Sequence, residues 1–343
     1  MTPCRVGLVG YGDAGRLIHA PLLALAGLHV TTVSTSDPGR REAALAGIPG
    51  VEVVDDLETL LTRDLDLVVL ASPTGVHTGQ AVSCVEAGVP VVVDKPLATN
   101  AADADRVVRV AREANVPLTV FQNRRWDGEH VALRALLESG SLGEVFRFER
   151  RWERWRPVPK DRWRENADAT RGGGILLDLH SHLVDSAANL FGPVARVYAE
   201  LSARTTRAED DAFLACTHVS GVRSHLGALS LAAAPGPRTR VLGTRAAYVV
   251  TSFESEPTAF ADLLDESEAH CGWRVVGDQR EPVPRPPVEH ADFYRAVAAA
   301  LHGDGAWPVD PWDAVHVLAV LDAARLSAET GQVRVVEDPA SES

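Results

Sequence analysis

The sequence predicts an α/β protein with two domains: residues 1–124 on a parallel sheet, and residues 125–343 as an α+β domain on a large, mostly antiparallel sheet. Three observations lead to this prediction. Apolar, strand-like runs alternate with Ala- and Leu-rich segments up to about residue 124. Later in the chain, strand-like runs follow one another directly. The length of 343 residues also exceeds what one hydrophobic core usually supports.

The first domain alternates predicted strands with predicted helices. The strands are short and almost continuously apolar, which indicates a parallel sheet covered by helices on both faces. The predicted strands are 5–10, 29–34, 65–72, 89–95 and 117–122, and the predicted helices are 14–26, 39–46, 56–62, 76–87 and 100–114.

The second domain begins with a predicted helix at 128–139 and an alternating, strand-like run at 143–155. A loop rich in Pro, Arg and Trp at 156–171 leads into an apolar helix at 175–191. Strand candidates separated by Gly, Pro or Asp turns come next, which is typical of an antiparallel meander. They are 195–205, 211–219, 222–233, 239–244 and 246–252. The chain is expected to close with a surface connection and two helices, at 277–290, 289–302 and 311–329.

Composition and charge exclude several classes of function. The formal net charge is −13, which argues against non-specific binding to nucleic acid or to an anionic membrane. No run approaches the roughly 18 apolar residues of a membrane-spanning helix. The first residues enter a strand-like run at once, so we expect no signal peptide. The four cysteines form no CxxC pair, which favours reduced thiols in a cytoplasmic protein.

The first predicted strand is followed by the glycine pattern G-x-G-x-x-G, within the run GLVGYGDAGR. Glycines at these places permit a tight turn and a close approach of the backbone to a pyrophosphate, which rests on the helix N-terminus. The pattern therefore predicts a dinucleotide-binding Rossmann domain, with a purely structural turn as the alternative. The residues expected to contact the cofactor here are Gly10, Gly12, Asp13, Ala14 and Gly15.

Residues after the second predicted strand bear on which dinucleotide is bound. An acidic residue about 20 positions beyond the glycines would bind the ribose 2′-hydroxyl of NAD. That position is Thr35, and the carboxylate of Asp37 comes two places later, before a proline. Hydroxyl groups and arginines suit the 2′-phosphate of NADP better, so NADP is favoured and NAD is the alternative. The residues expected at this phosphate are Ser34, Thr35, Ser36 and Arg40. In the other interpretation, Asp37 caps the next helix and the arginines are solvated.

Two further loops follow strands of the parallel sheet, in the runs ASPTGVH at 71–77 and VVVDKP at 91–96. The carboxyl ends of parallel strands form the ligand-binding edge of open α/β sheets. On the nicotinamide side we therefore expect Ser72, Pro73, Thr74, His77, Asp94, Lys95 and Asn123.

Lys95 is a candidate catalytic residue. Only Lys95 and Lys160 are lysines among 34 basic residues, and a lysine amine can be tuned where a guanidinium stays charged. We expect Lys95 to hydrogen-bond a substrate hydroxyl and to depress the pKa of a neighbouring imidazole. An ordinary turn at the end of a strand is the alternative.

The apolar helix at 175–191 carries a stripe of polar residues along one face. Burial of unpaired carboxylates is costly, so this stripe is expected to face a wet cavity or to find partners. An imidazole ordinarily changes its charge near neutral pH, so His182 is the natural candidate for a proton acceptor. Asp178, one turn earlier, would orient His182 or hold a substrate hydroxyl. The stripe consists of Asp178, His182, Asp185 and Asn189.

A metal site formed by Asp178, His180 and His182 is a rival interpretation of the same helix. With 3.6 residues per turn, however, His180 points about 160° away from the face shared by Asp178 and His182. We therefore expect no metal.

The segment 145–165 combines basic residues with tryptophans. Such interleaving can indicate single-stranded nucleic acid binding, but acidic residues share the stretch and the whole chain is anionic. We instead expect a strand and a loop over a polyol site, since Trp and Arg suit the faces and hydroxyls of sugars. Trp155, Arg156 and Trp163 are the expected substrate contacts, together with Asp178 and His182.

Together, the runs GLVGYGDAGR, VVVDKP and GGGILLDLHSHLVD resemble the glucose–fructose oxidoreductase/inositol dehydrogenase/MocA (Gfo/Idh/MocA) family over the whole chain. Members of that family are NAD(P)-dependent oxidoreductases that act mostly on sugars, inositols and their derivatives. The runs VFQNRRWDGE and RWRPVPKDRWRE are further similar to the branch that contains NADP-dependent scyllo-inositol dehydrogenases. The resemblance implies that Lys95, Asp178 and His182 form the catalytic set. Two residues depart from the family pattern: Asp94 replaces a common Glu, and His180 stands where Gly is usual and could reshape the pocket.

The resulting hypothesis is an enzyme that transfers hydride between a nicotinamide cofactor, with NADP favoured, and a secondary alcohol of a sugar, inositol or related cyclic polyol. The resemblance also implies a homodimer or homotetramer, often formed through the open face of the antiparallel sheet. Two alternatives stay open: a non-catalytic, nucleotide-sensing regulator, against which the intact Lys95, Asp178 and His182 argue, and a cofactor-retaining sugar transferase or hydrolase.

Overall fold

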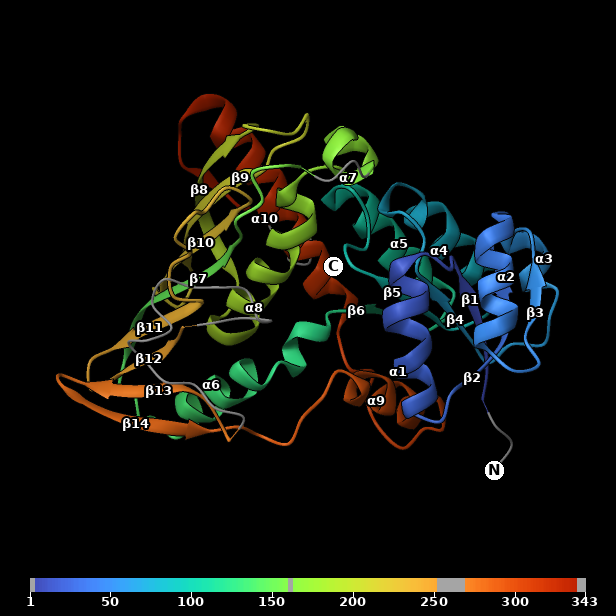
Figure 1. The fold of residues 1–343 in the computed structure, drawn as a ribbon, viewed down its shortest axis with the longest axis horizontal. Helices are drawn as coiled ribbons and strands as arrows, with labels where there is room; N and C mark the ends of the chain where they lie inside the picture. Colours follow the sequence, from blue (N-terminus) through green and yellow to red (C-terminus); the bar gives the residue numbers. More distant parts are fainter. Residues whose placement is uncertain (1–3, 160–162, 252–268, 338–343) are drawn as a thin grey trace. The chain divides into compact units, whose positions relative to one another are not determined.

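The computed structural model describes residues 4–159, 163–251 and 269–337, and the chain divides into two compact units (Figure 1). Unit 1 comprises residues 1–123 and 289–315, and unit 2 comprises residues 124–288 and 316–343.

Unit 1 is built on a six-stranded parallel sheet in the order β3-β2-β1-β4-β5-β6. Strands β4 and β6 are buried at every position, which requires helices on both faces. The predicted Rossmann arrangement is thus confirmed. Strand β3 has no counterpart among the predicted strands, because its three residues are too few to establish a pattern. The strands are β1 (Arg5–Val9), β2 (His29–Ser34), β3 (Glu52–Val54), β4 (Leu67–Leu70), β5 (Val91–Asp94) and β6 (Leu118–Phe121).

The helices of unit 1 begin at recognisable signals. Asp37 accepts a hydrogen bond from the Arg40 amide, and Pro38 occupies the first helical position of α2. Asn100 caps α5 in the same way, accepting from the Asp103 amide at 2.9 Å. The helices are η1 (Ala14–His19), a π-helical turn that continues into α1 (Ala20–Leu25), then α2 (Pro38–Gly47), α3 (Leu57–Leu61), η2 (Thr74–Val76), α4 (His77–Glu86), α5 (Ala101–Glu113) and η3 (Asn123–Trp126).

Residues 289–315 return to unit 1, although the sequence analysis predicts one boundary, after residue 124. Helix α9 (Ala291–Leu301) packs on α1 and brings Phe293 and Tyr294 against Phe121 of β6, with ring centroids 5.0 and 5.5 Å apart. The Thr119 hydroxyl also donates to the carbonyl oxygen of Val309. These contacts join segments at least 170 residues apart, which sequence periodicity cannot reveal.

Unit 2 is built on a nine-stranded, mostly antiparallel sheet in the order β14-β13-β12-β11-β7-β10-β9-β8-β15, as expected for the C-terminal domain. The exception to the antiparallel pattern is the parallel pair β7 and β10. The strands are β7 (Val145–Glu153), β8 (Val194–Ser202), β9 (Asp211–His218), β10 (Arg223–Leu229), β11 (Thr239–Gly243), β12 (Ala247–Val250), β13 (His270–Val276), β14 (Gln279–Pro284) and β15 (Arg334–Val335).

The predicted surface connection at 277–290 is partly wrong, because residues 279–284 form β14, paired with β13. Its proline-rich sequence obscured the strand: Pro282 and Pro284 lie on the edge strand of the sheet, where a missing N–H group is tolerated.

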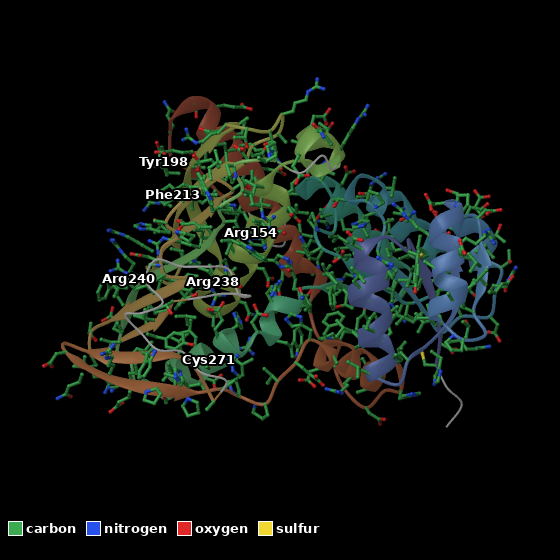
Figure 2. All side chains as sticks on the ribbon, viewed as in Figure 1. Arg154, Tyr198, Phe213, Arg238, Arg240 and Cys271 are labelled. Atoms are coloured by element: carbon green, nitrogen blue, oxygen red, sulfur yellow. The ribbon has the colours of Figure 1, made fainter. Side chains whose placement is uncertain are left out.

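Helices cover one face of the nine-stranded sheet. Helix α6 contacts β13, and α8 contacts β7 and β10. In α10, Ser327 and His316 accept hydrogen bonds from backbone amides of β8. Side chains of β9 alternate between buried and half-buried positions, so the other face is open; Tyr198, Phe213 and Arg240 lie there (Figure 2). The helices are α6 (Gly128–Glu138), α7 (Trp163–Asn166), η4 (Ala169–Arg171), η5 (Leu176–His180), which is π-helical, α8 (Ser181–Phe191) and α10 (Pro311–Thr330), whose first five residues belong to unit 1.

Among the described residues, no helix is long and apolar enough to cross a membrane. Cys4, Cys84, Cys216 and Cys271 are buried free thiols, as the sequence analysis predicts for reduced cysteines.

Candidate active site

The predicted site residues are divided between the two units. The glycine loop, the loops after β4 and β5, and Lys95 belong to unit 1, whereas Asp178 and His182 belong to unit 2.

Two glycines of the loop after β1 are required by the protein's own packing. Gly10 has φ +91°, and a Cβ atom there would lie 2.8 Å from the carbonyl oxygen of Ala71. A Cβ atom on Gly15 would clash with the carbonyl oxygen of Gly10. The tight turn therefore excludes side chains at both positions.

Gly12 is different, because packing does not explain its missing side chain. The nearest atom to a Cβ placed there is Cζ of Arg40, at 3.9 Å. The backbone is thus open to close approach at this point, directly before the turn η1 with Asp13 exposed and Ala14 half-buried. An open glycine at the start of a helix fits the pyrophosphate of a dinucleotide.

The residues after β2 separate into buried and exposed groups. Ser34 and Thr35 are buried, and the Ser34 carbonyl accepts from the Gly10 amide. Ser36 and Arg40 are exposed, and within the described ranges the Arg40 guanidinium makes no hydrogen bond or ion pair. Asp37 serves as the cap of α2.

His77 connects the loops after β4 and β5. Its Nε2 lies 2.8 Å from the carbonyl oxygen of Ser72, and its Nδ1 lies 2.9 Å from that of Pro96. Burial lowers its pKa, against an opposing effect of the nearby Asp94 carboxylate. A neutral imidazole has one N–H, so the ring donates to one of these carbonyls and packs against the other, and it lies between the two loops that are predicted to face the nicotinamide.

The other predicted cofactor contacts in unit 1 lie on the same loops. Thr74 is buried and Pro73 is exposed at the start of η2. Asp94 accepts a hydrogen bond from the Lys95 amide at 2.8 Å. Asn123, the first residue of η3, is buried, and its Nδ2 lies 3.2 Å from Nδ1 of His290.

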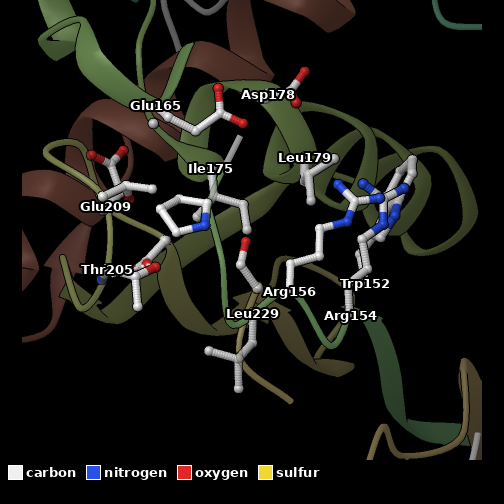
Figure 3. Close-up of a pocket in the computed structure, with 15 residues that line it drawn as sticks. Trp152, Arg154, Arg156, Glu165, Ile175, Asp178, Leu179, Thr205, Glu209 and Leu229 are labelled. Atoms are coloured by element: carbon white, nitrogen blue, oxygen red, sulfur yellow. Dashed lines mark hydrogen bonds between the residues drawn. The ribbon is translucent and has the colours of Figure 1, made fainter. Parts of the chain in front are cut away.

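In unit 2, Asp178 lines a pocket between η5 and the end of β7 (Figure 3). The guanidinium groups of Arg154 and Arg156 gather beside the Trp152 ring, and Glu209 and Thr205 lie at the opposite side. The pocket also exposes the apolar side chains of Ile175, Leu179 and Leu229 and the carboxylate of Glu165. It therefore offers hydrogen-bond donors, acceptors and apolar surface together.

The imidazole of His182 packs on the same tryptophan. The ring centroids of His182 and Trp152 are 5.7 Å apart, with an interplanar angle of 30°, and His182 is buried. Arg154 places its Cζ 5.2 Å from the centroid of the Trp152 ring. Trp152 thus connects His182 with the arginine side of the pocket.

The other two members of the polar stripe have structural partners. Asp185 is 1% exposed and forms a two-pronged ion pair with Arg125, at 2.6 and 3.0 Å. The Asn189 side chain accepts from Arg134 and lies 3.0 Å from Nε2 of His130.

His180 points away from the pocket, as the helical geometry predicts. It is fully buried, and its Nε2 donates to the carbonyl oxygen of Leu226 in β10 at 3.3 Å. Burial lowers its pKa to about 4. The part of the chain that the structure describes holds no group of three or more side chains suited to a metal ion.

The three predicted substrate residues of the segment 155–163 have different placements. Arg156 lines the pocket, whereas Trp155 is 52% exposed and is not among the lining residues. The side chain of Trp163 lies outside the described part of the structure. Residue Arg154 was missed, although the alternation of Trp152, Arg154 and Arg156 along a strand would have placed all three on one face.

Comparisons with known proteins match both units. Residues 4–122 match the family described as "Oxidoreductase family, NAD-binding Rossmann fold", and residues 130–249 match the "GFO/IDH/MocA C-terminal domain". Oxidoreductase YdgJ of Escherichia coli (strain K12) is 34% identical over 338 residues, covering 95% of this chain and 96% of that relative. The chain belongs to the Gfo/Idh/MocA family.

Other relatives of this Gfo/Idh/MocA protein agree with that assignment. The scyllo-inositol 2-dehydrogenase (NADP(+)) IolW of Bacillus subtilis (strain 168) is 28% identical, covering 97% of this chain and 96% of the relative. The crystal structure of an NAD-binding protein from Listeria innocua superposes with a TM-score of 0.83 at 26% identity, covering 97% of each chain. The protein is therefore a dehydrogenase or reductase with a nicotinamide cofactor, and its substrate is a small molecule.

Replacing Gly12 by Ala tests whether the open backbone holds the cofactor. We expect G12A to fold normally but to bind NADPH about tenfold more weakly or worse, a loss of about 1.4 kcal/mol, because a methyl group enters the open space. NADPH fluorescence titration and thermal melting measure the two effects. Gly79→Ala, which also adds a methyl group in open space but lies in α4, is the matched control. Unchanged NADPH affinity in G12A would remove the loop from cofactor binding.

Replacing Arg125 by Met tests the structural role of Asp185. We expect a loss of about 3–5 kcal/mol in the free energy of unfolding, because the buried Asp185 carboxylate loses the opposite charge and two hydrogen bonds of the guanidinium. The double variant R125M/D185L should recover much of that loss. Arg274→Met, which breaks an exposed pair with Glu281, should cost below about 1 kcal/mol. Urea denaturation measures all three, and a cost for R125M no larger than that for R274M would contradict the assignment.

Proposed function

We propose that this enzyme oxidises a secondary alcohol of a cyclic polyol or sugar with NADP, or catalyses the reverse reduction. The main support for this proposal is the mixed polar and apolar lining of the pocket at Asp178. Arg154 and Arg156 donate hydrogen bonds, Glu165 and Glu209 accept them, and Trp152 offers an apolar face. A polyol presents hydroxyls that both donate and accept around an apolar ring, so it matches this mixed lining better than a molecule of one charge.

The chemistry follows from the residue types. We propose that His182 takes the proton from the reacting hydroxyl, because imidazole titrates near neutral pH. The Lys95 ammonium would hydrogen-bond the same oxygen and stabilise the negative charge that develops there. Asp178 would orient the substrate through its hydroxyls. The nicotinamide ring, when bound, supplies the hydride acceptor or donor at C4. This assignment requires that Lys95 and His182 reach one small ligand.

Two observations favour NADP over NAD. The Asp37 carboxylate is engaged at the start of α2, where it accepts from the Arg40 amide at 2.8 Å, so it is poorly placed to bind a ribose hydroxyl. The exposed Arg40 guanidinium lies beside the open Gly12, with the exposed Ser36 nearby in the chain. A cation and a hydroxyl at this position suit a 2′-phosphate. The named cofactor of the relative IolW, NADP(+), agrees with this choice.

The relatives named inositol 2-dehydrogenase support a cyclic polyol as the substrate class, among them the enzyme of Mycolicibacterium smegmatis at 37% identity over 150 residues. We further propose a homodimer or homotetramer formed through the open face of the nine-stranded sheet, where Tyr198 and Phe213 lie. A cytoplasmic location agrees with four buried free thiols.

Lys95→Met tests the catalytic assignment. We expect kcat to fall by about a hundredfold or more, because the side chain keeps its volume but loses the charge and the hydrogen-bond donor. NADPH should still bind with nearly unchanged affinity. The assay is NADPH absorbance with a panel of inositols and sugars, each run with NAD and NADP. Activity of K95M close to that of the wild type would remove Lys95 from the mechanism. If the wild type oxidises or reduces no compound of the panel, the polyol assignment is rejected.

Arg40→Ala tests the choice of cofactor. We expect the KM for NADP to rise about 10- to 100-fold, as for the loss of one hydrogen bond to a charged group, while the KM for NAD changes little. Arg41→Ala is the matched control, because Arg41 is already bonded to the Val53 carbonyl and to Asp55. An equal loss for both cofactors, or a larger effect in R41A, would contradict the assignment.

A further inference from the structure

Unit 1 contains a buried polar chain, Tyr294–His19–Asp94, which the roles proposed above leave unexplained. His19 ends the π-helical turn η1, and its side chain is 0% exposed. Its Nδ1 lies 2.6 Å from the Tyr294 hydroxyl of α9, and its Nε2 lies 3.7 Å from Oδ2 of Asp94 at the end of β5. A buried imidazole between a phenol and a carboxylate is a costly arrangement in an otherwise apolar region.

The hydrogen bonds determine which nitrogen of His19 carries the proton. Burial, reinforced by the Asp94 charge, raises the pKa of Tyr294 well above its usual value, so the hydroxyl keeps its proton. The phenol donates to Nδ1, which leaves the imidazole proton on Nε2, facing Asp94. Among the described residues Nε2 has no hydrogen-bond partner, and its distance to the carboxylate is that of an electrostatic contact.

Asp94 is kept as an anion by its surroundings. Burial alone would raise the pKa of its carboxyl, but the attraction of His19, followed by Lys95 and His77, brings the pKa below the usual value. The groups that face His19 from the elements packed around it are Asp94, Tyr294 and, more distantly, His77; Phe121 covers the ring without charge, at 4.5 Å between centroids.

The Asp94 carboxylate holds the backbone of the predicted catalytic lysine. Its Oδ1 accepts from the Lys95 amide at 2.8 Å, and on the other side of Lys95 the carbonyl of Pro96 is held by His77. The direction of the Asp94 carboxylate therefore sets one anchor of the lysine backbone, and His19 contacts the oxygen that the lysine amide does not use.

We propose that His19 is a positioning residue for Lys95: its Nε2–H holds the Asp94 carboxylate, which holds the lysine backbone, and the Tyr294 hydroxyl fixes the tautomer that does so. The role rests on the proposed function, since it concerns the lysine assigned to the reacting oxygen. It also gives a reason for a polar chain within the aromatic cluster of β6 and α9.

Kinetics of four variants test the proposal. His19→Leu should lower kcat about 10- to 100-fold, the scale expected when a catalytic group is displaced by an ångström, with the KM for the polyol and the affinity for NADPH nearly unchanged. His19→Gln, whose amide nitrogen can replace Nε2–H, should restore most of kcat, and Tyr294→Phe should fall between the two. Phe121→Leu, the control, removes the ring that packs on His19 and should change thermal stability but not kcat.

A measurement without turnover separates this proposal from the proposed function. In a Lys160→Arg background Lys95 is the sole lysine, so reductive methylation with ¹³C-formaldehyde gives one lysine NMR signal besides that of the α-amino group. Adding His19→Leu should move the lysine signal, and adding Phe121→Leu should not. An unchanged chemical shift of the lysine signal in H19L, or a kcat of folded H19L within about twofold of wild type, would overturn the proposal. If the wild type oxidises no polyol but the signal moves in H19L alone, the proposed function fails and the positioning of Lys95 stands.

Discussion

Unit 2 depends on the matching of buried charge. An ionised group removed from water is tolerated only beside an opposite charge or several hydrogen-bond donors. In unit 2 the carboxylate of Glu129 lies 3.6 Å from the Arg150 guanidinium and 3.1 Å from that of Arg238, and it accepts from the Thr239 hydroxyl. None of the three charged side chains is more than 7% exposed. The cluster ties α6 to β7 and β11, and burial lowers the pKa of Arg238 to about 10.

The same constraint separates structural polar residues from candidates for chemistry. Asp185 and Asn189 lie on the same helix as Asp178 and His182, but their partners belong to unit 2 itself and hold α8 in place. Asp178 is half-buried and lines the pocket, where a ligand can reach it. The ion pair of Asp185 explains that residue by structure alone, whereas the place of Asp178 in the pocket lining makes it accessible to a ligand.

Local pattern predicted most of the helices and strands and the glycine loop, although not β3 or β14, because strand burial, helix caps and tight turns are decided largely by neighbours in the chain. The cap formed by Asp37, one of the two interpretations of that residue, follows from such a local signal, whereas the space at Gly12 is bounded by Arg40, which is distant in sequence. Local sequence patterns do not predict contacts between segments that are distant in the chain. The docking of α9 on β6, the pairing of Arg125 with Asp185 and the chain from Tyr294 to Asp94 each join residues at least 60 positions apart.

The spacing argument for the catalytic helix assumed an ideal α-helix, and η5 departs from one. Asp178 lies within a π-helical turn, whose wider i→i+5 bonding changes the direction of each side chain. Asp178 consequently lines the pocket, while His182 in α8 packs on Trp152 instead of lining it. A residue that orients a substrate and a residue that takes its proton must approach different atoms of one ligand. In the proposed mechanism Asp178 orients the substrate and His182 takes its proton, and the π turn lets these two residues, four positions apart, face different atoms of one ligand.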